Sequence, residues 1–172
     1  TGEVDPDHVL TNTGLQVEQD LILTKPLGIG VITTAIKAGT VDDDSLQTAI
    51  NSMERLNDEA SRVAISAGTT GATDVTGFGL LGHLGKMTKA SGVNAVLYVD
   101  QIPFLPAARQ YVEDGIVPGG TRRNLAWIAD QVDAGSFSEI DLLLLADAQT
   151  SGGLVFGVDK DKTGDVCAEL EE

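Results

Sequence analysis

Asp74 is the residue whose type and surroundings best suit chemistry, and it lies in the segment Ala72–Leu84, which reads ATDVTGFGLLGHL. The aspartate precedes a glycine-rich turn that opens into a helical pattern. Amide groups at a helix N-terminus lack intrahelical partners, and the helix dipole adds partial positive charge, so a phosphate can bind there without a basic side chain. The pattern therefore indicates a hard divalent cation that bridges the carboxylate and phosphate oxygens.

The glycines of this segment can also be explained by packing. Gly79, Gly82 and Gly85 fall within a helical pattern of apolar residues, where each costs roughly 0.5–1 kcal/mol relative to alanine. A closely approaching backbone or ligand would offset that cost. The residues alone leave two interpretations open: a binding site, or a packing seam in which Thr76 or Asp74 only caps the helix.

A dinucleotide-binding module is the alternative from another class of protein. Gly77, Gly79 and Gly82 match the pattern Gly-x-Gly-x-x-Gly, and Asp100 follows about 20 residues later. The preceding strand is weak, because Val75 is its only large apolar residue. A noncatalytic assembly domain, in which the glycines serve packing alone, is the third possibility.

The elements that position these residues follow from hydrophobic period and from turn residues. The pattern predicts about five strands and six helices without fixing the strand order. Strands are expected near 8–10 and at 21–24, 95–99 and 154–158, with a weak one before Asp74. Helices are expected at 31–38, 45–68 with a possible break near Asn57, 78–91, 107–113, 122–132 and 161–172, whereas 142–145 fits either type.

Several side chains carry individual expectations. Gly39 should close the helix before it, and Asp42–Asp44 should cap the next helix rather than bind a metal. Lys25 is expected as a surface lysine, with phosphate contact as the alternative. Thr121 should cap its helix, with Trp127 on the buried side; Cys167 should be a small buried hydrophobe.

Composition excludes several function classes. The 172 residues carry a net charge of −15, which argues against nucleic acid or an anionic membrane as a partner. One cysteine and two histidines cannot build a thiolate or imidazole cluster, so carboxylates must hold any metal. The lone cysteine favours a reducing compartment, and the absence of a long apolar run or signal peptide favours a cytoplasmic location.

Four segments in order carry a resemblance to a known family. Asp74–His83, which reads DVTGFGLLGH, resembles the signature of the selenophosphate synthetases (selenide, water dikinases). Three further segments are similar to the same family: Leu23–Gly28, Pro118–Asn124 and Gln149–Leu154. Ile29 departs from the family pattern, which usually has threonine there.

The resemblance implies an α+β fold in which a mixed β-sheet is flanked by helices in three layers (α/β/α), similar to the C-terminal domain of the aminoimidazole ribonucleotide synthetase superfamily. It implies that residues 1–172 are a single domain, the C-terminal half of a two-domain enzyme whose N-terminal ATP-binding and catalytic domain is absent. Enzymes of this family convert selenide, ATP and water to selenophosphate, AMP and phosphate. The fragment alone is expected to be inactive.

One site residue follows from the resemblance, residue by residue. The family aspartate that matches Asp74 holds Mg²⁺ on the ATP phosphates together with aspartates of the N-terminal domain. No catalytic residue is expected in this fragment. The implied cofactors are Mg²⁺ and ATP, the implied partners are ATP and selenide through the missing domain, and the full-length enzyme is expected to be a homodimer.

Overall fold

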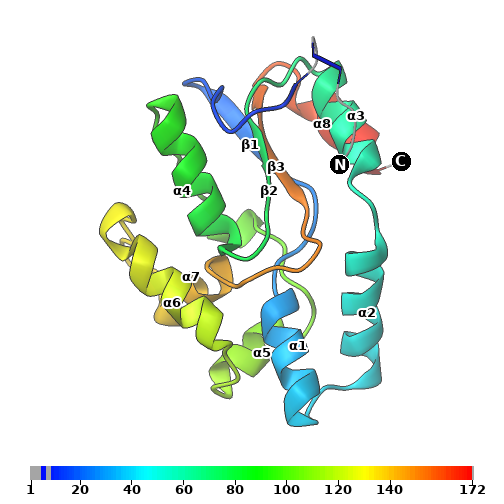
Figure 1. Ribbon diagram of the computed structural model, residues 1–172, viewed down its shortest axis with the longest axis vertical. Coiled ribbons are helices and arrows are strands. Elements are labelled where there is room, and N and C mark those ends of the chain that lie inside the picture. Colours follow the sequence, from blue (N-terminus) through cyan, green and yellow to red (C-terminus); the bar gives the residue numbers. More distant parts are fainter. Residues whose placement is uncertain (1–4, 7–8, 172) are drawn as a thin grey trace.

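Three short strands form the sheet of this α+β chain, whose computed structural model describes residues 5–6 and 9–171 (Figure 1). The strands are β1 (Gln19–Leu23), β2 (Ala72–Asp74) and β3 (Leu154–Asp159). β3 lies in the middle, and both of its neighbours run antiparallel to it. The α+β class is therefore confirmed, but the sheet is antiparallel rather than mixed. Parallel pairing among the described residues is limited to two isolated bridges, Thr11 with Gly71 and Leu27 with Phe104.

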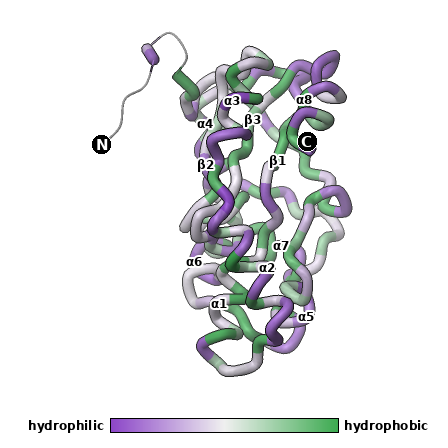
Figure 2. The backbone as a smooth tube through the Cα atoms, turned by 90° about the vertical axis from the view of Figure 1, so that its right-hand side faces the viewer, coloured by the Kyte–Doolittle hydropathy of each residue, from purple (hydrophilic) through white to green (hydrophobic). Residues whose placement is uncertain are grey.

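Helices cover both faces of the sheet and build the opposite end of the molecule. Their bounds are α1 (Ile29–Ala38), α2 (Asp43–Glu54), α3 (Asp58–Ser66), α4 (Gly79–Ser91), α5 (Ala108–Glu113), α6 (Gly119–Ile128), α7 (Glu139–Leu145) and α8 (Thr163–Glu171), with short 3₁₀ turns at Val99–Gln101 and Ala129–Gln131. α3 and α8 lie at the same end as the sheet, whereas α1 and α5 lie at the other end (Figures 1 and 2). No helix within the described ranges is long and apolar enough to cross a membrane.

The central strand separates two parts of the core because successive side chains of a strand point to opposite faces. Phe156 and Val158 pack with Val63 of α3 and Val166 of α8. Val155 instead joins the cluster that contains Val75 and the apolar face of α4. Asp74 thus ends an edge strand of a sheet that is packed on both faces.

The expected strand at 95–99 is wrong, because this segment pairs with no described strand. Val96 and Tyr98 are 74% and 64% exposed, while Leu97 and Val99 pack inward. Exposed and buried side chains do alternate along this segment, as in a strand. The alternation arises because one side of an extended segment packs on the core, without hydrogen bonds to a neighbouring strand. The strand predicted near 8–10 falls partly outside the described residues, and Val9 and Leu10 are not in a strand.

Other boundaries agree with the sequence. Gly39 closes α1 in the left-handed conformation, and Asp42 caps α2 by accepting from the Ser45 amide. The break near Asn57 is confirmed, since α2 ends at Glu54 and α3 begins at Asp58. The ambiguous run 142–145 is helical, because Ser138 and Asp141 form a capping box at the start of α7.

Three side-chain expectations are wrong. α6 begins at Gly119, so Thr121 lies inside the first turn and its hydroxyl points to a buried carboxylate instead of capping the helix. Trp127 is 50% exposed, because its ring lies against Phe78 at the surface rather than in the core. Cys167 is exposed, because α8 turns Val166 toward the core instead.

Candidate functional site

Asp74 is the last residue of β2, where it lies opposite Leu154 of β3. Its side chain is exposed, and its carboxylate makes no hydrogen bond with any described residue. The backbone beside it is fixed, because the Val75 amide donates to the Gly153 carbonyl at 2.8 Å. A free carboxylate is therefore presented from a rigid strand end.

The turn after Asp74 is held by two other segments, one around Asn124 and one from Ala146 to Gln149. The Thr76 carbonyl accepts from the amides of Gln149 and Gly79, at 3.0 and 2.9 Å. The Gly77 carbonyl accepts from the Asn124 side-chain amide at 2.8 Å. Gly79 has φ of 68°, and a Cβ there would overlap the Ala146 backbone, which explains why glycine is needed at this position.

The first turn of α4 has no side-chain cap, so the capping interpretation of Asp74 and Thr76 is wrong. The Thr76 hydroxyl lies 3.1 Å from His83 Nε2, and the Phe78 amide donates to the same nitrogen at 3.4 Å. Because Nε2 accepts, Nδ1 carries the proton in the neutral ring. Burial lowers the pKa of His83; the Asp74 charge opposes that shift, and the Lys86 charge adds to it. His83 thus holds the turn as a neutral acceptor.

The later glycines of α4 serve packing, as one of the two interpretations expected. A Cβ on Gly82 would lie 2.7 Å from Phe78 Cβ, and one on Gly85 would lie 2.9 Å from Ile128 Cδ1. The glycines therefore let Phe78 lie on α4 and let α6 approach it. The contacts of α4 with Phe78 and α6 fix the turn. The Asp74 carboxylate takes no part in them and is exposed.

Asp147 is a buried carboxylate beside the candidate site, and the sequence did not predict it. It is fully buried. It accepts from the backbone amides of Gly30 and Val31 at 2.9 and 3.2 Å, and from the Thr121 hydroxyl and the Gln149 amide at 2.8 and 3.0 Å. Burial raises its pKa to about 6, although each of these hydrogen bonds opposes the shift. The sequence offered one sign of this role. Asp147 follows the apolar run 142–145 closely, and a carboxylate buried there needs hydrogen-bond donors.

Asp147 brings together the segments that carry the resemblance. Gly30 follows the first segment, Thr121 belongs to the third, and Gln149 belongs to the fourth. Gln149 also holds the Thr76 carbonyl of the second segment. Four stretches far apart in sequence thus meet around the turn that carries Asp74.

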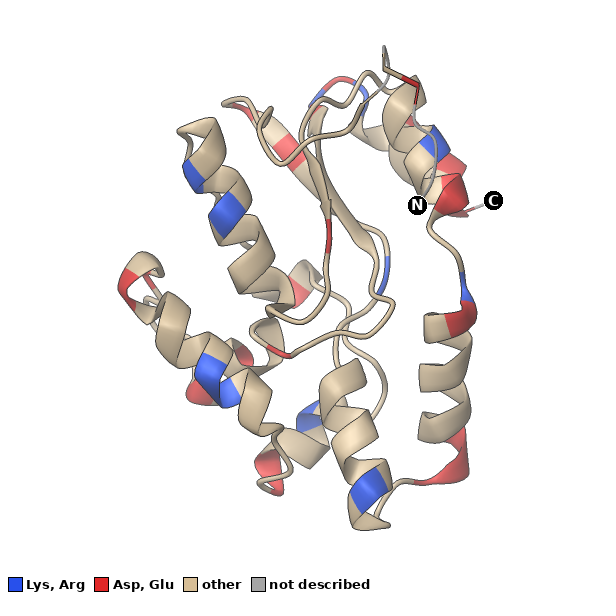
Figure 3. Cartoon of the chain, in the orientation of Figure 1, with Lys and Arg blue, Asp and Glu red and all other residues tan. Residues whose placement is uncertain are grey.

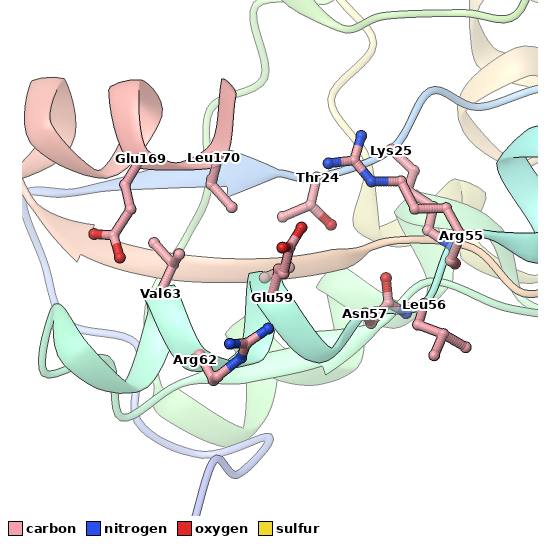
Figure 4. A pocket seen from close by; sticks show the side chains of 11 residues that line it. Thr24, Lys25, Arg55, Leu56, Asn57, Glu59, Arg62, Val63, Glu169 and Leu170 are labelled. Carbon is pink, nitrogen blue, oxygen red and sulfur yellow. The ribbon is translucent and has the colours of Figure 1, made fainter. Parts of the chain in front are cut away.

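Lys25 is neither a surface lysine nor free to bind phosphate. It is 4% exposed, and its ammonium donates to the carbonyls of Ser52, Arg55 and Ser151 at 3.1, 2.6 and 2.8 Å. Burial, followed by the charge of Arg55, lowers its pKa. Lys25 lines a cavity of about 240 Å³ near the start of α3 (Figure 4). Its three N–H donors are all used by carbonyls at the C-terminal end of α2 and in the loop before β3, so none is left for a ligand.

The described residues do not form a complete metal site. No group of three or more metal-binding side chains occurs in the described part of the chain. Asp74 lines neither the 240 Å³ cavity nor a second, largely apolar one of about 910 Å³ beside α4. Mg²⁺ usually takes only one or two protein carboxylates, together with phosphate oxygens and water. Asp74 therefore fits one ligand of a shared site.

The context that a dinucleotide fingerprint requires is missing from the described residues. The strand before the glycines has three residues and pairs antiparallel, whereas the fingerprint needs a βαβ unit. Asp100 lies in a 3₁₀ turn and does not end a strand. The structure thus gives no support to the dinucleotide alternative.

The fold is shared with a solved kinase. The structure of thiamine-monophosphate kinase from Stenotrophomonas maltophilia K279a matches with a TM-score of 0.67 and 16% sequence identity, covering 98% of this chain and 48% of that one. At this identity the match shows the fold alone. The sequence adds the family: residues 16–172 match the family model described as AIR synthase related protein, C-terminal domain, and the chain belongs to that family.

Curated relatives make the resemblance more specific. The chain is 44% identical over 172 residues to "Selenide, water dikinase" of Porphyromonas gingivalis strain ATCC 33277, covering 99% of this chain and 49% of that protein. It is 41% identical to the protein of the same name from Carboxydothermus hydrogenoformans, covering 99% and 50%. The resemblance found in four motifs is thereby confirmed, and the chain spans about half the length of these relatives.

Proposed function

We propose that this chain is the C-terminal half of a selenide, water dikinase, which converts selenide, ATP and water to selenophosphate, AMP and phosphate. The observation that carries the proposal is the free carboxylate of Asp74 at the turn where four family-like segments meet. The likeness to the dikinases over nearly the whole chain supports the same assignment.

In this proposal Asp74 is one ligand of the Mg²⁺ on the ATP phosphates. The ion, when bound, neutralises charge that develops on the phosphoryl oxygens during transfer. The chain's own part is to hold the carboxylate in place. The Val75 amide fixes the strand end, and Gln149 and Asn124 fix the turn beside it. Positioning of this kind is a large part of phosphoryl-transfer catalysis.

The remaining parts of the active site would come from an N-terminal domain. One carboxylate cannot hold Mg²⁺ alone, and no catalytic nucleophile is assigned to this chain. We therefore expect the 172-residue chain to be inactive by itself, and the longer enzyme to act in the cytoplasm as a homodimer on ATP and selenide.

The test is selenide-dependent formation of AMP by the longer enzyme that contains this chain. Asp74→Asn should abolish AMP formation while leaving the fold intact, because the amide keeps the shape but loses the charge. Asp100→Asn is the matched control and should retain activity, since Asp100 lies on a 3₁₀ turn outside the assigned site. Near-normal turnover by Asp74→Asn would overturn the assignment.

A further inference from the structure

Helices α4 and α6 present the basic face of an acidic protein. The chain has 26 acidic and 11 basic residues, yet the sequences of α4 and α6 contain no Asp or Glu. They carry four exposed cations: Lys86, Lys89, Arg122 and Arg123. Figure 3 shows these two helices in blue and tan. None of the four cations makes an ion pair or a side-chain hydrogen bond with a described residue.

Two exposed aromatic rings lie among these cations. Phe78 and Trp127 are 45% and 50% exposed, and their ring centres are 5.8 Å apart. The Lys86 ammonium lies 3.8 Å from the centre of the Phe78 ring and 5.7 Å from that of Trp127. Arg123 is one helical turn before Trp127 and hence on the same side of α6. We call Phe78, Lys86, Lys89, Arg123 and Trp127 the α4–α6 face.

The α4–α6 face borders the turn that carries Asp74. Phe78 belongs to that turn, and its ring centre is 5.7 Å from that of His83. His83 Nε2 in turn lies 3.1 Å from the hydroxyl of Thr76, which is two residues after Asp74. The α4–α6 face therefore begins four residues after Asp74, in the turn that follows it.

The chemistry of the covering surface follows from these charges. If Asp74 binds Mg²⁺, the other protein ligands must be oxygen donors, chiefly carboxylates, on another surface. An acidic surface would be repelled by a chain of net charge −15 unless it met cations. Exposed Trp, Phe and Arg side chains that lie together are also typical of protein interfaces rather than of simple phosphate sites.

Resting on the proposed function, we infer that the α4–α6 face is the docking surface for an acidic, carboxylate-bearing surface of the other half of the enzyme. The chain spans about half the length of its relatives, so a polypeptide of comparable size is available to cover it. Trp127 and Phe78 supply the apolar contact, and Lys86, Lys89 and Arg123 select the acidic partner.

The experiment is hydroxyl-radical footprinting of Trp127, the single tryptophan of this chain. Its oxidation is compared between the 172-residue chain and the longer enzyme. We expect oxidation to be slower in the longer enzyme by about fivefold or more, because interface cores exclude water. The double variant Lys86→Glu with Arg123→Glu should restore fast oxidation, whereas Lys37→Glu with Lys160→Glu, which makes the same charge change at exposed positions elsewhere, should not.

Each other outcome overturns the inference. Equal oxidation of Trp127 in both proteins would show an uncovered face. Protection in the 172-residue chain that grows with its concentration would assign the face to a second copy, and protection of that chain by added ATP would assign it to a phosphate ligand. If Trp127 is unprotected while AMP formation still requires Asp74, only this inference fails. If Asp74 is dispensable, the proposed function fails.

Discussion

Asp147 shows how one buried side chain can organise a site that it does not enter. Its carboxylate joins the N-terminal end of α1 to Thr121 and Gln149, and through Gln149 to the turn after Asp74. It remains costly to ionise in this environment, since burial raises its pKa despite four hydrogen bonds. That cost should be visible in the dependence of stability on pH.

We expect ionisation of Asp147 to lower the free energy of unfolding as pH rises from about 4 to about 6. The pKa of Asp147 is raised from 3.8 to about 6 on folding, so within this window the folded state binds more protons than the unfolded state. The linked loss is about 3 kcal/mol, complete above the folded pKa. Urea denaturation at a series of pH values measures it, and Asp147→Asn should remove this component. An unchanged slope in the variant would contradict the assignment.

His83 reports on the position of Asp74 without any ligand. Burial keeps its pKa below 6.5, and the negative charge of Asp74 partly opposes that shift. Asp74→Asn should therefore lower the pKa of His83 further, as measured by NMR titration of its ring protons, with His83→Gln used to assign the signal. An unchanged or higher pKa would mean that the carboxylate lies away from the ring.

At the scale of elements, local signals predicted most of the helices and failed where long-range contacts decide. The break between α2 and α3 and the glycine end of α1 follow from local residues. The segment 95–99 shows a strand pattern but lacks a strand partner, and pairing depends on the whole fold. Asp74 was predicted because its motif is contiguous in sequence. Asp147 was not, because its partners come from three separate segments.

The loop before β3 gives a sharp test of the packing around the turn. A Cβ on Gly152 would overlap the Val75 carbonyl, whereas nothing lies within 4 Å of a Cβ on Gly77. Gly152→Ala should therefore destabilise the chain by about 3 kcal/mol, since the obstacle is backbone, and Gly77→Ala should change stability by less than about 0.5 kcal/mol. Urea denaturation of the two variants measures these changes in the free energy of unfolding. Equal effects of the two substitutions would contradict the close contact between Gly152 and the Val75 carbonyl.

At the scale of the whole molecule, an acidic chain carries two helices, α4 and α6, without acidic residues, and we propose that its Asp74 supplies one ligand of a shared metal site. Resemblance predicted the family and Asp74. The basic α4–α6 face was not expected, because the cations of α4 and those of α6 are 33 to 37 residues apart in sequence and meet only in the fold. The net charge of −15 gives no sign that α4 and α6 carry basic residues and no acidic ones.

Mg²⁺ should bind weakly to the 172-residue chain. The single carboxylate of Asp74 lacks the phosphates and further ligands that Mg²⁺ requires, and no described cluster replaces them. Isothermal titration calorimetry should give a dissociation constant in the millimolar range or weaker. Micromolar affinity would show a complete metal site within this chain.

The most direct test of Asp74 as a metal ligand is the affinity of the longer enzyme for Mn²⁺–ATP, measured by electron paramagnetic resonance with Mn²⁺ in place of Mg²⁺. We expect Asp74→Asn to weaken that affinity by about tenfold or more, because a direct carboxylate ligand is lost, while Asp100→Asn leaves it unchanged. Equal affinities for the wild type and Asp74→Asn would contradict the account.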